Sequence, residues 1–172
     1  RSDPESPLPD GARAAFDGLD WWAPDPAYYF VGQVHAYLVP VRVEIVTRRG
    51  ERRPCAKVGW IAFPIDGREV RLQVYRLLDL EPQEGGAGYF LPFQDATTGA
   101  ETYAAGRYVE LSGPEGGPFV LDFNTPTNPF CAYGAPERYA CPVTPRENRL
   151  SVRIEAGERG FLHVPALAAS DG

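Results

Sequence analysis

The side chains of this chain that could bind a ligand or catalyse a reaction carry carboxylate, amide and guanidinium groups. They do not form a recognised catalytic motif. The segment PFVLDFNTPTNPFCAYG places Asp122 and Asn124 at the end of an apolar run. Because successive side chains of a strand alternate between its two faces, these residues share one face, opposite Phe119, Leu121 and Phe123. We therefore expect Asp122 and Asn124 at a strand exit, facing solvent or a cleft.

Other polar residues extend this candidate site. Two carboxylates beside an Arg can divide acid and base roles when their separation and pKa values suit, and the weak catalytic candidates are Glu101, Asp122 and Glu147. The candidate ligand-binding residues are Tyr103, Arg107, Asn124, Asn128 and Asn148. The competing interpretation is a structural network, because Asn and Asp stabilise turns and a buried Arg–carboxylate pair can hold a loop to the fold.

Three cysteines bear on stability and on metal binding. Cys131 and Cys141 lie ten residues apart in a Pro-rich segment, where they would either close a short loop as a disulfide or remain buried thiols, and Cys55 would be left over. The paired C-x2-C spacing of a zinc site is absent. We expect no metal and no cofactor. G-x-S-x-G, H-E-x-x-H and a Gly-rich phosphate loop are also missing, which favours a role other than catalysis.

The sequence around these residues predicts strands. Val41, Val43 and Ile45 alternate with polar residues, the period of a half-buried strand. Asp66-Gly67 predicts a tight hairpin turn, because Gly adopts the positive φ that such a turn requires. Further strand patterns are YFLPF, GRYVEL, GPFVLDF, RLSVRIEAG and GFLHVP. The pattern predicts an all-β single domain, an antiparallel barrel or sandwich with long Pro-rich loops and at most short helical turns.

The two ends of the chain differ from its middle. Residues 1–30 read as an extended aromatic and Pro-rich arm, residues 31–165 as the β domain, and residues 166–172 as a tail. The arm concentrates apolar rings that would either plug the domain or face a partner protein. These partner-facing candidates are Trp21, Trp22, Tyr28, Tyr29 and Phe30.

Composition excludes some partners and bears on location. The 172 residues suit one domain, and 18 Gly with 18 Pro indicate many turns. A net charge of −6 without a basic stripe argues against nucleic acid, since phosphate neutralisation supplies most non-specific affinity. The apolar run of ~20 residues that spans a bilayer is absent, so we expect no transmembrane segment. The chain starts at Arg1 and contains no Met, which favours an exported or periplasmic location over the cytoplasm.

Four blocks resemble a known family. FQDATTGAETYAAGRYVEL, VLDFNTPTNPFCAYG, CPVTPRENRL and IEAGE resemble, in order, the signature blocks of the bacterial and archaeal domain of unknown function 1684, and GWIAFPIDG is similar to its first half. The resemblance implies no activity, because the family has no established one. It marks the following positions, none with a known role: Asp95, Thr97, Gly99, Glu101, Thr102, Tyr103, Gly106, Arg107, Tyr108, Asp122, Phe123, Asn124, Asn128, Pro129, Cys131, Cys141, Pro142, Glu147, Asn148 and Leu150.

This chain departs from the family pattern in its central loop. Thr125-Pro126-Thr127 stands where the resemblance leads us to expect Arg-Ala-Tyr, and Ala104 stands where we expect Gly. The loop therefore lacks an Arg, the residue best suited to bind an anion there.

Three functions are consistent with these observations. The first is a non-catalytic accessory or scaffolding subunit that docks on other protein subunits through its aromatic arm. The second is a small-ligand-binding β domain with a polar site at Glu101, Tyr103, Arg107 and Asp122. The third is a carboxylate-dependent hydrolase. The absent catalytic motifs and the altered loop favour the first.

Overall fold

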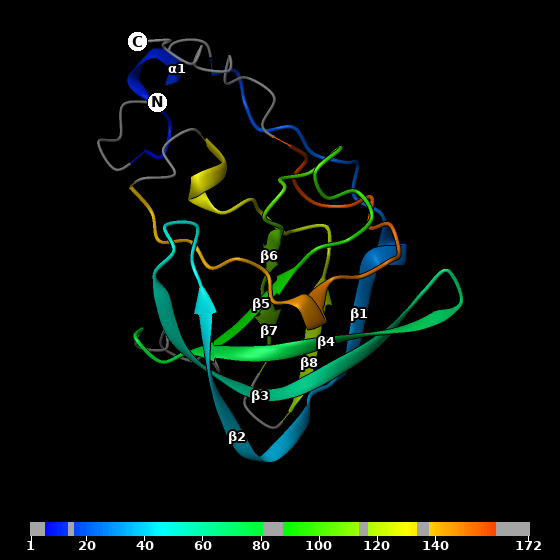
Figure 1. The fold of residues 1–172 in the computed structure, drawn as a ribbon. Helices are drawn as coiled ribbons and strands as arrows, with labels where there is room; N and C mark the ends of the chain where they lie inside the picture. Colours follow the sequence, from blue (N-terminus) through cyan, green and yellow to red (C-terminus); the bar gives the residue numbers. More distant parts are fainter. Residues whose placement is uncertain (1–5, 14–15, 81–87, 114–116, 134–137, 161–172) are drawn as a thin grey trace.

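The predicted all-β class is confirmed by the computed structural model, which describes residues 6–13, 16–80, 88–113, 117–133 and 138–160. Two antiparallel sheets stack as a sandwich and do not close into a barrel (Figure 1). The predicted tail, residues 166–172, lies outside the described residues.

The larger sheet has five strands in the order β2-β3-β4-β5-β6 and the smaller has three in the order β1-β8-β7. The strands are β1 (Tyr29–Gln33), β2 (His35–Val46), β3 (Arg52–Ile65), β4 (Arg68–Leu77), β5 (Tyr89–Phe93), β6 (Arg107–Val109), β7 (Leu111–Ser112) and β8 (Pro118–Asp122). The helical turns are α1 (Asp10–Arg13), η1 (Pro26–Tyr28), η2 (Phe130–Tyr133) and η3 (Arg146–Asn148). None of the helices among the described residues is long and apolar enough to cross a membrane.

The predicted hairpin turn at Asp66-Gly67 is confirmed. Ile65 pairs with Arg68, and the two residues between them have φ values of 50° and 71°. Two consecutive positive φ angles are the mark of the tight turn whose twist matches that of paired strands. The turn fixes the register of β3 and β4, which pair along the whole length of β4.

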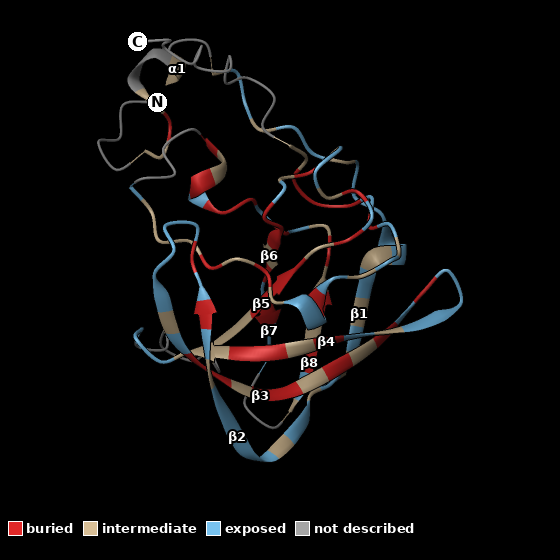
Figure 2. Ribbon diagram, viewed as in Figure 1, coloured by how far each residue is buried: buried red, intermediate tan, exposed pale blue. Residues whose placement is uncertain are grey.

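The core lies between the two sheets. Phe63 of β3 meets Phe30 of β1 and Phe123, which directly follows β8, at ring-centroid distances of 5.2 and 5.1 Å. Figure 2 shows buried residues concentrated along β3 to β6 and exposed ones along β2. Burying these aromatic and aliphatic side chains is the main source of stability for the sandwich.

A bulge in β3 exchanges which residues face the core. Lys57 pairs with Tyr75 and Gly59 with Val74, so Val58 is an extra residue between them. The extra residue shifts the alternation of side chains by one position. Odd-numbered residues of β3 therefore face away from the core before the bulge and toward it after the bulge. Cys55 and Tyr75 therefore form, with Ile45, a small second apolar cluster apart from the main core.

The C-terminal region differs from the sequence-based prediction. The segment RLSVRIEAG was expected to be a strand, but residues 149–157 form no strand and join the fold through single bridges, such as Gln94 to Arg149. Two of its carbonyl groups, those of Ile154 and Ala156, receive hydrogen bonds from the buried side chain of Arg107. The other predicted strand, GFLHVP, lies almost wholly outside the described residues.

The N-terminal segment packs on its own domain. β1 begins at Tyr29, inside the predicted arm, and pairs with β8 in an antiparallel register. Phe30 and Tyr28 pack against the main core, and the Leu8 side chain is buried. The end of the arm is thus part of the three-stranded sheet.

Candidate functional site

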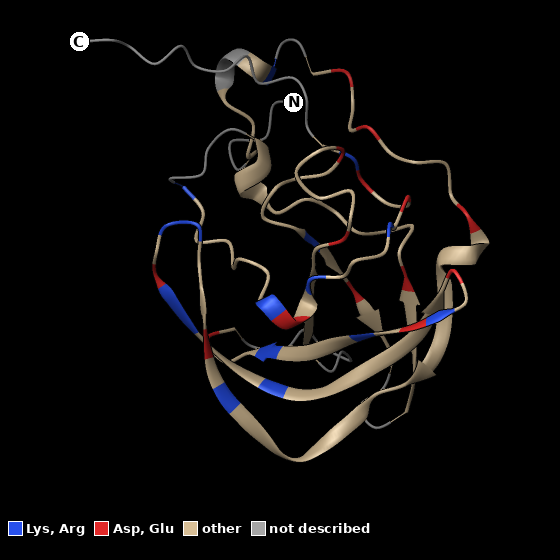
Figure 3. Ribbon diagram, turned by 45° about the vertical axis from the view of Figure 1, so that its right-hand side comes forward, with Lys and Arg blue, Asp and Glu red and all other residues tan. Residues whose placement is uncertain are grey.

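A groove crosses the face of the large sheet that carries the small second cluster. Its volume is about 370 Å³, and we call it the Lys57 groove. The lining comes from β2, β3, β4 and the segment around η3: Val43, Glu44, Ile45, Val46, Lys57, Tyr75, Val143, Thr144, Pro145, Arg146, Glu147 and Arg149. In Figure 3 the short turn η3, coloured blue and red, lies close to β4.

Three polar side chains meet in the groove. The Lys57 ammonium forms an ion pair with Oε1 of Glu147, and the Tyr75 hydroxyl donates a hydrogen bond of 2.8 Å to the same oxygen. Lys57 comes from β3 and Tyr75 from β4, where the bulge aligns them as a cross-strand pair. The second oxygen of Glu147 and the remaining donors of Lys57 are thus available to a ligand.

The surroundings set the protonation of this cluster. Burial alone would raise the pKa of Glu147, but hydrogen bonds from Lys57, the backbone and Tyr75 hold that pKa below its usual value. Burial and the hydrogen bond to Glu147 raise the pKa of Tyr75. At neutral pH Glu147 is therefore a carboxylate and Tyr75 a neutral hydroxyl.

Two guanidinium groups lie at the rim of the groove. Arg146 and Arg149 are exposed and form no ion pair with any residue that the structure describes. Together with Lys57 they contribute three positive charges, against two negative charges from Glu44 and Glu147. The groove is thus locally cationic in a protein of net charge −6.

Asn148 holds η3 in place over the sheet. Its side-chain oxygen accepts a hydrogen bond from the Gln73 N–H at 2.7 Å, and its Nδ2 donates to the carbonyls of Gln73 and Pro92 at 2.9 and 2.8 Å. These bonds fill the gap where β4 and β5 diverge, since the two strands pair only near Tyr75. Asn148, predicted as a ligand-binding residue, is buried and positions its neighbour Glu147.

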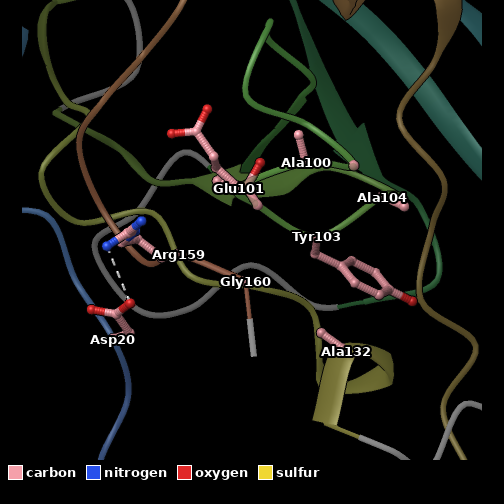
Figure 4. Close-up of a pocket in the computed structure, with 10 residues that line it drawn as sticks. Asp20, Ala100, Glu101, Tyr103, Ala104, Ala132, Arg159 and Gly160 are labelled. Atoms are coloured by element: carbon pink, nitrogen blue, oxygen red, sulfur yellow. Dashed lines mark ion pairs between the residues drawn. The ribbon is translucent and has the colours of Figure 1, made fainter. Parts of the chain in front are cut away.

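Glu101 and Tyr103 line a second, smaller pocket of about 250 Å³ (Figure 4). Asp20 and Arg159 form an ion pair of 3.4 Å at its wall. The Glu101 carboxylate contacts Arg153 at 2.7 Å. Burial raises the pKa of Tyr103, an effect that nearby Arg48 partly offsets. The structure thus brings together two of the four residues predicted for the polar site.

Arg107, the third of those residues, is buried with a side-chain exposure of 1%. Its guanidinium donates to the carbonyls of Ile154, Ala156 and Glu158 and lies 3.6 Å from the Asp95 carboxylate. Burial lowers the pKa of Arg107, and the carboxylates oppose that shift. Arg107 thus holds the C-terminal segment in place from within the domain.

Glu158 and Asn128 extend this buried network. The Glu158 carboxylate accepts hydrogen bonds from the backbone and side-chain N–H groups of Asn128 at 2.8 and 2.9 Å, and from the Tyr133 hydroxyl. Burial raises the pKa of Glu158, and the bonds from Asn128 and Tyr133 partly offset the rise. Asn128, another predicted ligand-binding residue, thus ties the loop after β8 to the C-terminal segment.

Asp122 and Asn124 act at the exit of β8, as their spacing predicted. Asp122 accepts hydrogen bonds from the backbone and side chain of Asn124, each at 2.9 Å. Asn124 in turn exchanges hydrogen bonds with the backbone of Asp25. The pair stabilises the turn after β8 and fixes the start of the neighbouring strand β1.

The structure does not contain the disulfide predicted between Cys131 and Cys141. Both are free thiols, as is Cys55. The Cys131 thiol donates a hydrogen bond of 3.2 Å to the Tyr139 carbonyl, and burial raises the pKa of Cys141 to about 12. In the described part of the chain, no group of three or more His, Cys, Asp or Glu side chains is placed to hold a metal ion.

The aromatic arm divides into inward and outward residues. The Trp22 ring lies 5.4 Å from the Arg107 guanidinium and 5.3 Å from that of Arg159. Trp21 and Tyr29 are exposed, with 41% and 48% of their surface accessible. Trp22, Tyr28 and Phe30 therefore pack within the domain, and only two of the five partner-facing candidates point outward.

Sequence reasoning identified Glu147 but missed Lys57 and Tyr75. Both occupy strand positions that look structural in a linear pattern, and a bulge within β3 brings them to the groove. One signal was present: Lys57 is the only Lys among 17 basic residues.

Comparison with known proteins agrees with the resemblance found in the sequence. The family described as "Protein of unknown function (DUF1684)" matches residues 14–159. An uncharacterised protein from Haloarcula marismortui, solved by solution NMR, matches with 33% sequence identity and a TM-score of 0.71 over 93% of this chain and 85% of that chain. No curated protein matches. The family match extends over most of the chain, and the chain therefore belongs to the DUF1684 family.

Proposed function

We propose that this protein binds a small organic anion with an apolar body in the Lys57 groove. The observation that carries the proposal is the arrangement of Lys57, Tyr75 and Glu147 below two guanidinium groups. Charged groups that are already oriented by hydrogen bonds lose little entropy when they engage a ligand. The charged side chains of the groove are thus already oriented for a ligand.

The walls of the groove define the class of ligand. Val43, Ile45, Val46, Val143 and Pro145 supply an apolar surface, and Arg146 and Arg149 supply charge at the rim. A volume of about 370 Å³ lies within the range typical of small-molecule sites, which combine apolar walls with a few placed polar groups. A carboxylate with an aliphatic tail matches both features.

The protonation of the cluster favours binding over acid–base catalysis. A catalytic acid needs a proton near neutral pH, whereas the pKa of Glu147 is lowered and its carboxylate is paired with Lys57. Tyr75, whose pKa is raised, remains a hydrogen-bond donor to that carboxylate. These properties suit Glu147 as a group that positions the Lys57 ammonium for an anionic ligand.

Calorimetric titration with octanoate tests the proposal, with octanol as the neutral ligand of matched tail length. We expect octanoate to bind with one site per chain and octanol to bind at least tenfold more weakly. Replacing Lys57 with Met removes one charge and should weaken octanoate about tenfold or more, since a charge-assisted hydrogen bond contributes about 1.5–3 kcal/mol. Lys57→Arg keeps the charge and is the control. Equal binding of octanoate and octanol would contradict anion recognition.

An accessory role in a protein assembly is the second candidate function. It is supported by Tyr29 and Val31, which lie two residues apart on β1, share one face and expose 48% and 66% of their surface. If a partner protein co-purifies with the wild-type chain, replacing both residues with Ser should abolish that co-purification. Retention of that protein by the double variant would exclude this face as its docking site.

A further inference from the structure

We infer that the edge of β2 pairs with a second copy of this chain, in a two-fold arrangement centred on Val43. Among the residues that the structure describes, β2 lies at the end of the five-stranded sheet and pairs as a strand with β3 alone (Figure 1). Such an edge presents backbone groups that can extend the sheet into another molecule. This inference does not depend on the ligand of the Lys57 groove.

The open backbone groups belong to Arg42 and Glu44. Further along β2, the Val46 carbonyl accepts a hydrogen bond from the Val143 N–H, and the Arg48 N–H, just beyond the strand, donates to the Cys141 carbonyl. Even-numbered residues here therefore face the outer edge, because the peptide groups of a strand alternate in direction. The register against β3 is continuous from Val41 to Val46, so Arg42 and Glu44 face the same way.

Pro54 confirms this orientation from the other side. It lies opposite Glu44, and its carbonyl accepts a hydrogen bond from Leu78, on the side of the strand away from β2. Glu44 and Pro54 thus form a pair without mutual hydrogen bonds, and the Glu44 peptide groups point outward. Among the described residues, the segment at Val143 covers the edge only from Val46 onward.

The edge is complementary to itself. In an antiparallel pair centred on Val43, Arg42 lies opposite Glu44 of the second copy, and Glu44 lies opposite Arg42 of that copy. These are the two residues whose peptide groups face outward, so each opposed pair exchanges two backbone hydrogen bonds and also brings unlike charges together. Glu44 already contacts Arg52 of its own chain at 3.0 Å, so the second copy adds another guanidinium to an existing pair.

Apolar surface accompanies the charged pairs. In the same register Val41 lies opposite Ile45 of the second copy, on the face that carries Val43. Val41 exposes 52% of its surface, and Val39 and Leu38 in the adjoining bulge expose 75% and 103%. Figure 2 shows most of β2 in the exposed colour. Contiguous exposed apolar residues on one strand are typical of association surfaces.

Sedimentation equilibrium of the full chain tests the inference. We expect the average mass to rise from 18.9 kDa toward twice that value at sub-millimolar concentration. Arg42→Glu and Glu44→Arg, each made alone, place like charges opposite one another and should weaken association at least tenfold. The double variant restores opposite charges in swapped positions and should recover it.

The matched control exchanges Glu69 and Arg71, an exposed ion pair on β4 of the same sheet, and should leave association unchanged. Circular dichroism establishes that each variant folds. A wild-type chain that remains a monomer throughout would overturn the inference. So would a dimer that the single charge reversals leave intact, or a double variant that fails to recover association.

Discussion

At the scale of single residues, the same kinds of side chain serve two different purposes in this molecule. Arg107 and Glu158 are buried and bonded to the chain itself, whereas Lys57 and Glu147 lie in a groove that is open to solvent. Side-chain exposure separates the two groups: 1% for Arg107, but 29% for Lys57 and 37% for Glu147. Charged residues that retain access to solvent are those available to a ligand.

The buried Arg107 should contribute strongly to stability. Arg107→Met would leave three carbonyl groups without this donor and the Asp95 carboxylate without its cationic partner. We expect a loss of about 3–5 kcal/mol in the free energy of unfolding, because breaking a buried pair leaves an uncompensated charge. Urea denaturation measures this loss. Arg153→Met, which removes an exposed ion pair, is the control and should leave the midpoint nearly unchanged. Similar midpoints for both variants would contradict a structural role for Arg107.

Glu147 should give stability a distinct pH dependence. Its pKa in the folded protein is lowered, so ionised Glu147 stabilises the fold above its ordinary pKa, and this contribution disappears as pH falls through the lowered value. Glu147→Gln should therefore cost stability at neutral pH and cost nothing at strongly acid pH. The pair is partly exposed and screened, so we expect a difference of about 0.5–1 kcal/mol. Thermal unfolding of both proteins across this pH range measures it, and a constant difference would contradict the assignment.

At the scale of elements, η3 depends on one side chain for its position. Asn148→Ala would remove three hydrogen bonds to the backbone of β4 and β5 and leave buried groups unsatisfied. We expect a loss of about 3 kcal/mol in the free energy of unfolding and weaker octanoate binding, because Glu147 would no longer be held against Lys57. Denaturation and calorimetry measure the two effects.

Asn124→Ala, which loosens a surface turn, is the control and should leave octanoate binding unchanged. Normal binding by the Asn148 variant would show that η3 is held by other contacts.

Elements with a local signal were predictable from the sequence, and elements fixed by distant contacts were not. The β3–β4 hairpin follows from alternation and the Asp66-Gly67 turn, both encoded within a few residues. The segment 149–157 has the alternation of a strand, but the buried Arg107 guanidinium donates hydrogen bonds to two of its carbonyl groups, those of Ile154 and Ala156. No local pattern reveals that competition, because the donor lies more than 40 residues away in the sequence.

The candidate site was less predictable than the fold for the same reason. Spacing correctly placed Asp122 and Asn124 at a strand exit, where they stabilise a turn. The Lys57 groove requires the bulge at Val58, the pairing of β3 with β4 and the docking of η3, each set by tertiary contacts. Of its polar cluster, only Glu147 was identified in advance.

At the scale of the whole molecule, the two sheets bury one core between them and leave the groove on an outer face. The core carries the stability, and the groove combines residues of β2, β3 and β4 with the segment around η3, which Asn148 holds against the sheet. Sites on strands are positioned more precisely than sites on loops. A protein with net charge −6 thus presents a small, locally cationic surface.

The most direct test of anion binding in the Lys57 groove uses the single Lys of the chain. Protein labelled with [15N]lysine gives one backbone amide signal, from Lys57. We predict that octanoate shifts this signal in a saturable manner, that octanol does not, and that replacing Arg146 and Arg149 together with Met weakens the response about tenfold. A Lys57 signal that stays unchanged up to saturating octanoate would contradict the account.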